Sequence, residues 1–518
     1  MKRYLVLTIL IIVLFGCTAH LRESSVMNDE LIDINSLKAD IEFLSSDELE
    51  GREAGTQSEK LASLFITSEL KKYGIEPFMN ATEYFQNINL RVIRFSDKST
   101  FALTNERNKK ILEFEYGKNF IGSTSYYDQF DTTAKIVFVG YGITAEEYNY
   151  DDYADVNVEG KIVLIYPGEP QNDDSTFFEG KKQTIYSSFY RKVDTASEHG
   201  ALAIICMPES DKESDWRFLL SNNQKGKYQL KDKPVVKSTN RIPYIIINKE
   251  SFSKLLDFSP QSYQQIQTCL STGKTLPSFE LSKVARISWM FDTTGTVEVR
   301  NVIGKIEGTD PELKHEYIGI GAHYDHIGVG INGINNGADD NASGTAALLE
   351  IARAFSERKE NKRTILIAFH TAEEKGSLGS QYLAKDTSIT NNMDIHINMD
   401  MIGRGSADTI YCLGSDKLSS ELYDFVESVN KRGVNIYLDY SLNDPNDPHR
   451  FYYRSDHYSY ARKKVPSVFF FDYEMQDYHR PTDDADKINY TKILRVARLV
   501  YELALSAANR ESKFKVDL

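Results

Sequence analysis

Acidic and imidazole side chains recur directly after apolar segments in the second half of this 518-residue sequence. The densest stretch is GADDNASG (337–344), which follows the two histidines of GAHYDHIG (321–328). Clustered carboxylates repel one another and raise one another's pKa unless a positive charge lies among them. A pair of divalent cations meets that need, and His, Asp and Glu donors without nearby cysteines suit zinc, cobalt or manganese. Two such ions can activate a water molecule and polarise a carbonyl group, which is the chemistry of two-metal hydrolysis.

The elements that must position these side chains are apolar strands. Segments such as EYIGIGA, TILIAF, DIHINM and SVFFF alternate with helical patterns such as GTAALLEIARAFSERK. This alternation predicts an α/β fold with a mostly parallel, helix-covered sheet. Sites in such sheets form at the carboxyl ends of the strands. The residues at those ends are His323, Asp325, Glu373, Glu374, Asp400, Asp472, Tyr478 and His479.

Each of these residues also has a purely structural explanation. GADDNASG could be a turn in which Asn341 or Ser343 caps the following helix. Glu373 and Glu374 could favour the N-terminus of the next helix, and His479 could be a surface histidine. These explanations would have to hold independently at five strand ends, so we favour one shared metal site.

The order of these clusters and their amino-acid sequences resemble those of a known family. AHYDH, GADDNASG, AEE, NMDM, RSDH and DYHRPTD appear in the order seen in the zinc aminopeptidases, a family of di-metal exopeptidases that includes glutamate carboxypeptidases and glutaminyl cyclases. The resemblance covers residues 36–90 loosely and 296–518 well. It is greatest to bacterial secreted members with an inserted protease-associated domain. It implies a phosphorylase/hydrolase-like metallopeptidase fold and two divalent ions, with zinc as the first expectation.

The resemblance also implies a role for each metal-binding residue. His323 and Asp400 would bind one ion, Glu374 and His479 would bind the other, and Asp340 would bridge the two. By the same resemblance Asp339 belongs to the loop architecture.

Three further residues match positions that act on the substrate or on a ligand. Glu373 matches the general base that moves a proton from the attacking water to the leaving amine. Tyr478 resembles a tyrosine that hydrogen-bonds the developing oxyanion, and Asp325 a carboxylate that orients the His323 imidazole. The run 455–457 (SDH) matches a pocket-shaping motif, and His326, His370 and His396 match no ligand position.

The chain divides into five parts. Residues 1–17 have a basic start, an apolar run too short to span a bilayer, and the ending LFGC. This ending resembles a lipoprotein signal in which Cys17 is lipidated, with simple secretion as the alternative. Residues 18–35 are expected to be a tether, 36–90 the first part of the peptidase domain, and 286–518 the catalytic metallopeptidase domain. Residues 91–285 are a predicted β-rich insert that resembles a protease-associated domain.

The location and partners follow from the same features. A lipid anchor places the chain in a bacterial cell envelope without a spanning helix. Because Thr18 is not acidic, we expect the outer membrane in a cell with two membranes. The net charge of −14 disfavours nucleic acid as a partner. Peptides are the expected substrates, and the oligomeric state is left open. Cys206, Cys269 and Cys412 are widely spaced, which leaves one disulfide possible.

Four functions remain in view. The first is an aminopeptidase. The second is a glutaminyl cyclase, against which the complete set of ligands for two metals argues. The third is a carboxypeptidase, which needs cations for a free carboxylate and could use Arg404, Arg454 or Arg480. The fourth is a receptor-like ectodomain that has lost its chemistry, which the intact ligands and the intact glutamate pair disfavour.

Overall fold

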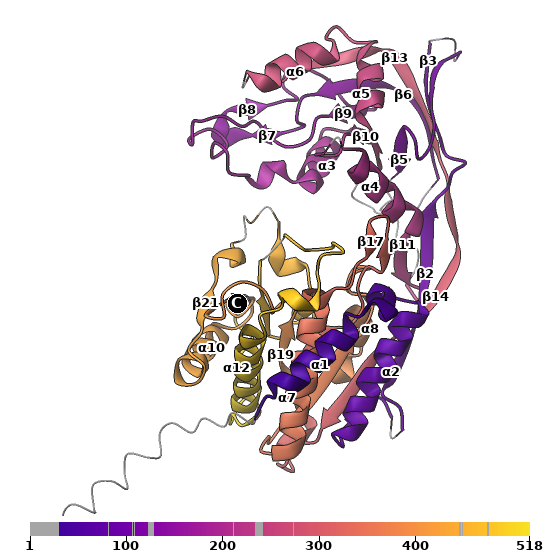
Figure 1. The fold of residues 1–518 in the computed structure, drawn as a ribbon. Helices are drawn as coiled ribbons and strands as arrows, with labels where there is room; N and C mark the ends of the chain where they lie inside the picture. Colours follow the sequence, from indigo (N-terminus) through magenta and orange to yellow (C-terminus); the bar gives the residue numbers. More distant parts are fainter. Residues whose placement is uncertain are drawn as a thin grey trace, which may run out of the picture.

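The computed structural model describes residues 31–518 except 81, 106, 108, 123–128, 211, 234–241, 273, 445–446, 448 and 474–475. Two units are visible, each built around its own sheet (Figure 1). The lower unit holds the first helices and the C-terminal half of the chain, and the upper unit is the insert. Two long strands, β2 (Phe85–Phe95) and β14 (Phe291–Ile306), run from one unit toward the other. The α/β class predicted from the sequence is confirmed.

A ten-stranded sheet forms the centre of the lower unit. Its strand order is β11-β2-β14-β18-β15-β19-β22-β20-β21, with β1 also paired to β14. The further bounds are β1 (Glu76–Pro77), β11 (Lys227–Leu230), β15 (Tyr317–His323), β18 (Thr364–His370), β19 (Met393–Met399), β20 (Thr409–Leu413), β21 (Tyr437–Asp439) and β22 (Ser467–Phe471).

The prediction of a mostly parallel sheet is wrong for the sheet as a whole. The four central strands β18, β15, β19 and β22 are parallel. By contrast β2, β14 and β11 pair antiparallel at one side, and β20 is antiparallel to β22. The reason is the insert: the chain leaves along β2 and returns beside it along β14, and neighbouring strands that leave and return this way must be antiparallel. The site depends on the parallel centre.

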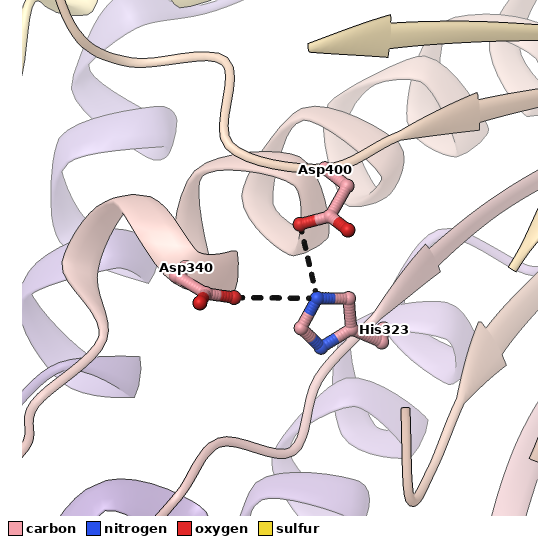
Figure 2. Close-up of side chains that lie close together, drawn as sticks. All are labelled: His323, Asp340 and Asp400. Carbon is pink, nitrogen blue, oxygen red and sulfur yellow. Dashed lines mark hydrogen bonds and ion pairs between the residues drawn. The ribbon is translucent and has the colours of Figure 1, made fainter. Parts of the chain in front are cut away.

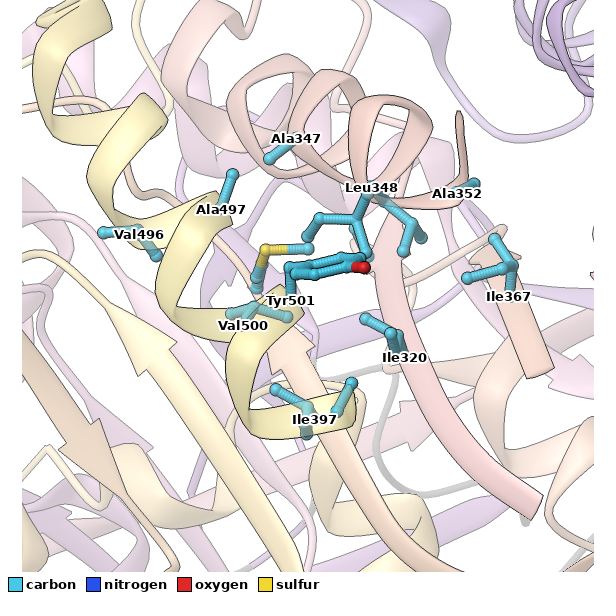
Figure 3. Close-up of a cluster of buried hydrophobic side chains, with 14 of the residues drawn as sticks. Ile320, Ala347, Leu348, Ala352, Ile367, Ile397, Val496, Ala497, Val500 and Tyr501 are labelled. Carbon is cyan, nitrogen blue, oxygen red and sulfur yellow. The ribbon is translucent and has the colours of Figure 1, made fainter. Parts of the chain in front are cut away.

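Helices cover both faces of this sheet. On one face lie α1 (Ile34–Leu44), α2 (Gln57–Lys72), α7 (Gly344–Arg358), α10 (Ser420–Arg432) and α12 (Tyr490–Ala508). Figure 3 shows α7 and α12 meeting the strands through Leu348, Val500 and Tyr501 over Ile320, Ile367 and Ile397. On the other face α8 (Leu378–Leu383) and α11 (His457–Ala461) pack on Leu366 and Ala368. A short helix, α9 (Thr387–Thr390), precedes β19.

The upper unit is an eight-stranded sheet in the order β4-β3-β13-β6-β9-β10-β12-β5. Its apolar core contains Phe138, Leu164, Ile205 and Trp289. The bounds are β3 (Thr100–Thr104), β4 (Lys110–Phe114), β5 (Phe120–Gly122), β6 (Phe130–Val139), β9 (Ile162–Ile165), β10 (Ala203–Cys206), β12 (Tyr244–Ile247), β13 (Ser278–Trp289), α3 (Phe189–Glu198), α4 (Glu213–Lys225), α5 (Lys249–Leu256) and α6 (Tyr263–Ser271). The insert is therefore mixed α/β, with four helices of eight or more residues among its described residues, whereas the sequence predicted a β-rich unit.

The predicted boundaries of the insert and of the tether need correction. Residues 91–95 belong to β2 of the lower sheet, residues 286–289 belong to β13 of the upper sheet, and β11 returns from the insert to pair with β2. The tether predicted for 18–35 ends earlier, because Ile32 is buried and Asp33 caps α1. Cys17 and residues 18–30 lie outside the described residues.

Among the described residues there is neither a disulfide nor a helix that could span a membrane. Cys206, Cys269 and Cys412 are free thiols, and Cys206 lies in a core cluster of the upper unit. Within the described part of the chain, each helix is too short or too polar to cross a bilayer.

Candidate metal centre

The predicted ligands converge at the carboxyl ends of the parallel strands. His323 ends β15, Glu374 follows β18, and Asp400 follows β19. Asp340 comes from the turn 338–343 before α7, and His479 from the loop after β22. Sequence separations of more than 150 residues are thus bridged by one sheet edge, as the strand-end argument predicts.

His323, Asp340 and Asp400 form the first group (Figure 2). The Nε2 atom of His323 lies 3.0 Å from Asp400 Oδ1 and 3.4 Å from Asp340 Oδ1. The other oxygen of Asp400 accepts a hydrogen bond from Ser455 Oγ at 2.7 Å. Ser455 belongs to the SDH run, so that motif acts here by orienting Asp400.

Glu374, His479 and the second oxygen of Asp340 form the neighbouring group. His479 Nε2 lies 3.0 Å from Glu374 Oε2 and 3.4 Å from Asp340 Oδ2. His326 also reaches this group, with Nδ1 2.8 Å from Glu374 Oε1. The two carboxylate oxygens of Asp340 therefore face two different sets of donors, which is the arrangement of a bridging carboxylate.

The electrostatics of the cluster favour positive charge at its centre. Burial alone would lower the pKa of His479, but Glu374 and Asp340 raise that pKa to about 10. Burial would likewise raise the pKa of Glu374, but His479 and His326 lower it to about 2. Carboxylates and imidazoles thus hold one another in their charged forms. A divalent cation would satisfy the same carboxylates.

The donor atoms fit metal ions. Glu374 Oε1, His326 Nδ1 and His479 Nε2 are buried and have no hydrogen-bond partner among the described residues. The ligand atoms of His323, Asp340 and Asp400 lie within 4.8 Å of one another, and so do those of His326, Asp340 and Glu374. Imidazole and carboxylate donors without sulfur suit zinc and its neighbours among divalent metals.

The loop around Asp340 is held by its own neighbours. Asp339 Oδ1 accepts a hydrogen bond from Gly403 N at 2.6 Å, which bears out its role in loop architecture. Asn341 Oδ1 accepts from Gly344 N at 2.9 Å, so Asn341 caps α7 as one explanation of this stretch predicts. The predicted bridging residue Asp340 and the capping residue Asn341 are thus neighbours in the chain. Ser343 instead donates to Asp339 O.

The three residues assigned to catalysis and orientation lie at the same edge. Glu373 lines a small pocket with Asp340, Glu374, Asp400 and Tyr478, and burial raises the pKa of its carboxyl. Asp325 contacts His323 differently from expectation: its main-chain oxygen lies 3.1 Å from Nδ1, whereas its carboxylate lies 3.8 Å away. That carboxylate accepts from Glu373 N at 3.0 Å.

Apolar side chains and one arginine also line this pocket. Met401, Phe451, Phe469 and Phe471 line it, together with Arg454. Arg454 Nη2 donates to Tyr478 Oη at 3.2 Å. The pocket is compact, with a volume of about 40 Å³.

The strand-end candidate Asp472 and the candidate carboxylate receptor Arg404 both have structural partners. Asp472 accepts from Arg404 N at 2.6 Å and pairs with Lys492, so it is a structural residue. Arg404 itself pairs with Asp483 at 2.5 Å, and Asp483 accepts from the backbone N–H groups of Asp339 and Asp340. Arg404 therefore supports the Asp340 loop, and a role as a carboxylate receptor is excluded for it by this pairing.

Sequence reasoning missed two buried residues. Arg52 is fully buried, and its guanidinium donates to the main-chain oxygens of Tyr324, Leu44, Asn336 and Gly337. His326 was given no ligand role, yet it lies against Glu374. The second histidine of HYDH was a visible signal for His326. No local pattern marks Arg52, because its partners are carbonyl groups of distant loops.

Comparison with known proteins now identifies the catalytic part. The model of peptidase family M28 matches residues 301–504, which span β15, β18, β19, β22 and every predicted ligand. The likeness to peptidase family M28 is therefore found over residues 301–504 of the chain. The chain is therefore a hydrolase of the peptidase class, as the resemblance predicted.

Relatives extend the likeness along the chain. Aminopeptidase YwaD of Bacillus subtilis is 24% identical over 90% of this chain and 83% of its own length. Leucine aminopeptidase 1 of Sclerotinia sclerotiorum is 30% identical over 39% of this chain, and the match spans 56% of that relative. Among solved structures, the aminopeptidase from Aneurinibacillus sp. strain AM-1 has a similar fold, with a TM-score of 0.56 at 22% identity. The match covers 94% of this chain and 96% of that one. The zinc aminopeptidase BSAP from Bacillus subtilis gives a TM-score of 0.55 at 20% identity, covering 93% and 96%.

Proposed function

We propose that the chain is a two-metal aminopeptidase that removes N-terminal residues from peptides, with zinc as the metal. The observation that carries the proposal is Asp340, whose two oxygens face His323 on one side and His479 on the other. Asp400 and Glu374 complete the two sets. Relatives named as aminopeptidases and as zinc metalloproteases support the reaction and the metal.

The residues around the cluster have separable tasks. Bound metal ions would supply a water of lowered pKa and polarise the scissile carbonyl. Glu373, at the pocket wall, accepts the proton of the attacking water and passes it to the leaving amine. The Tyr478 hydroxyl donates a hydrogen bond to the oxygen that gains negative charge. Asp325 holds the backbone of Glu373 and, through its main-chain oxygen, the ring of His323.

The pocket supports a preference for apolar N-terminal side chains. Its wall of Phe451, Phe469 and Phe471 offers hydrophobic contact. A free α-amine would lie beside the carboxylates, which attract its positive charge.

The base assignment is tested with Glu373→Gln. Glutamine has nearly the same shape but cannot accept the proton at neutral pH, so we expect bound zinc to be kept and kcat to fall by about 10²–10⁴-fold. Glu312→Gln, an exposed glutamate far from the pocket, is the matched control. A Glu373→Gln enzyme within about tenfold of wild type would falsify the assignment.

The substrate class is tested with aminoacyl amides, free and N-acetylated. An aminopeptidase should cleave the free amines and leave the acetylated ones, because acetylation removes the charged group that the carboxylates attract. Cleavage that survives acetylation would refute the aminopeptidase proposal. Preference for C-terminal substrates would favour the carboxypeptidase alternative, for which Arg454 is the one remaining candidate cation that lines the pocket.

We also propose that the upper unit is a protease-associated domain and that Cys17 carries a lipid that anchors the chain in the cell envelope. The run VGYGITAEEYNYDDYADVNVEGKIVLIYPG supports the first idea, and the LFGC ending supports the second. Incorporation of labelled palmitate into the wild-type chain, lost when Cys17 is replaced, tests the anchor.

A further inference from the structure

His326 is a buried imidazole that neither the family roles nor hydrogen bonding explains. Its side chain is 0% exposed. Neither ring nitrogen has a hydrogen-bond partner among the described residues. Buried polar groups almost always have partners, so an exception inside a functional cluster calls for an explanation.

The position of the ring is fixed by its surroundings. His326 N donates to Arg52 O at 3.2 Å, and the residue pairs with Glu53 as an isolated bridge. Gly337, at a φ of +61°, leaves room for the imidazole, because a Cβ there would lie 2.6 Å from His326 Cδ2. Backbone and glycine together direct the ring toward Asp340 and Glu374.

The Nδ1 atom faces two predicted metal ligands. It lies 2.8 Å from Glu374 Oε1 and 3.7 Å from Asp340 Oδ2. The 2.8 Å contact does not have hydrogen-bond geometry, since both atoms are without hydrogen-bond partners. His479 occupies the other oxygen of Glu374, at 3.0 Å. Two imidazoles thus flank one carboxylate, with their ring centroids 5.7 Å apart.

We infer that His326 Nδ1 is a ligand of the ion bound by Glu374, His479 and Asp340. The inference deepens the proposed function and rests on it. It makes the two metal positions unequal: the Glu374 position has two imidazoles, whereas the Asp400 position has only that of His323. Imidazole suits zinc, copper, iron and nickel, whereas carboxylate-rich sites accept manganese and magnesium. The Glu374 position is therefore the more selective one for zinc.

The other buried histidines differ in what they face: His370 Nδ1 and both ring nitrogens of His396 also lack hydrogen-bond partners, but among the described residues neither histidine pairs with a carboxylate as His326 does. His370 Nε2 accepts a hydrogen bond from Tyr460 Oη at 3.3 Å, and burial lowers the pKa of His370 to about 3. His396 stacks on Tyr460 with centroids 3.9 Å apart. Each is explained as a neutral core residue. Buried position alone does not make a ligand, and His370 serves as a matched control.

The test counts imidazoles by X-ray absorption at the zinc edge of the zinc-loaded full chain. In the wild type we expect three imidazoles shared by two zinc ions, and two imidazoles in His326→Leu. His370→Leu should keep three. Competition with a chelator should show that His326→Leu lowers the zinc affinity of one of the two binding steps by at least about tenfold. Losing a residue that only hydrogen-bonds a metal ligand already lowers metal affinity by about 10–100-fold.

The outcomes separate this inference from the proposed function. Two imidazoles in the wild-type spectrum, which needs no variant to fold, would overturn the role of His326 and leave the two-metal peptidase intact. A count unchanged by His326→Leu, or by the milder His326→Asn, would do the same. A wild-type chain that binds no zinc would overturn the proposed function itself.

Discussion

Replacing Arg52 by methionine should destabilise the catalytic unit more than any surface change. The guanidinium lies 2.9 Å from Tyr324 O, 2.7 Å from Asn336 O and 3.0 Å from Gly337 O, and it also donates to Leu44 O. These four carbonyl groups come from three separate parts of the chain. Burial lowers the pKa of Arg52 to about 10, so the group is still charged at neutral pH.

The size of the effect follows from the four acceptors. A buried polar group that loses its partner costs about 1–3 kcal/mol. At about 1 kcal/mol for each carbonyl group that loses its donor, the four groups together cost roughly 4 kcal/mol of folding free energy. Removing one partner of a buried ion pair typically costs about 3–5 kcal/mol, which is the same order of magnitude. At roughly 2–4 °C per kcal/mol for a unit of this size, the melting temperature should fall by about 10 °C.

Thermal unfolding followed by circular dichroism measures the change. Arg217→Met is the control, because Arg217 is exposed on α4 and pairs only weakly with Glu213 at 3.4 Å. Arg52→Lys should recover less than half of the loss, since one ammonium group cannot reach all four carbonyls. An Arg52→Met chain that melts within about 2 °C of wild type would show that the carbonyls find other donors.

Two further predictions concern α1 and the pocket. Burial raises the pKa of the Asp40 carboxyl from 3.8 to about 7. Ionising Asp40 in the folded chain therefore lowers the free energy of unfolding by roughly 4 kcal/mol. This loss is absent below the pKa of the unfolded chain and is complete above about pH 7. The Asp40→Asn chain should therefore melt at a higher temperature than wild type at pH 8 and at about the same temperature at pH 4. Glu42→Gln, at an exposed glutamate, should leave the melting temperature unchanged at both pH values. An equal rise at pH 4 and pH 8 would contradict the reasoning. Tyr478→Phe should lower kcat by roughly 10²-fold with little change in KM, as for the loss of one oxyanion donor. A kcat within about threefold of wild type would remove Tyr478 from the mechanism.

The site could be predicted from the sequence where it depends on strand ends. His323, Glu374 and Asp400 each follow an apolar strand, and parallel strands bring their carboxyl ends to one edge. Arg52 and Asp483 could not be found this way. They hydrogen-bond main-chain atoms of loops that come together only when the chain folds. Because every residue has the same main-chain atoms, residue types do not reveal such contacts.

The domain boundaries were mispredicted for a different reason. A boundary inferred from composition assumes that a change of pattern marks a change of unit, but β2 runs from Phe85 to Phe95 within the catalytic sheet and so crosses the predicted boundary. β2 has the alternating burial of an antiparallel strand from Gln86 to Val92, a pattern cut by the predicted boundary at residue 91. β11 adds a second crossing, since it lies within the insert in sequence and within the catalytic sheet in space.

The insert is consequently part of the support of the metal centre. Lys225, the last residue of α4, donates from Nζ to Ile327 O at 2.9 Å and to Glu53 Oε2 at 3.0 Å. The other oxygen of Glu53 accepts from Lys375 at 2.7 Å, and Lys375 directly follows Glu374. A path of charged contacts thus joins the insert to the loop of a predicted ligand and to the loop that holds His326. A displacement of α4 would have to break these contacts or carry both loops with it, so the geometry around Glu374 depends on where the insert lies.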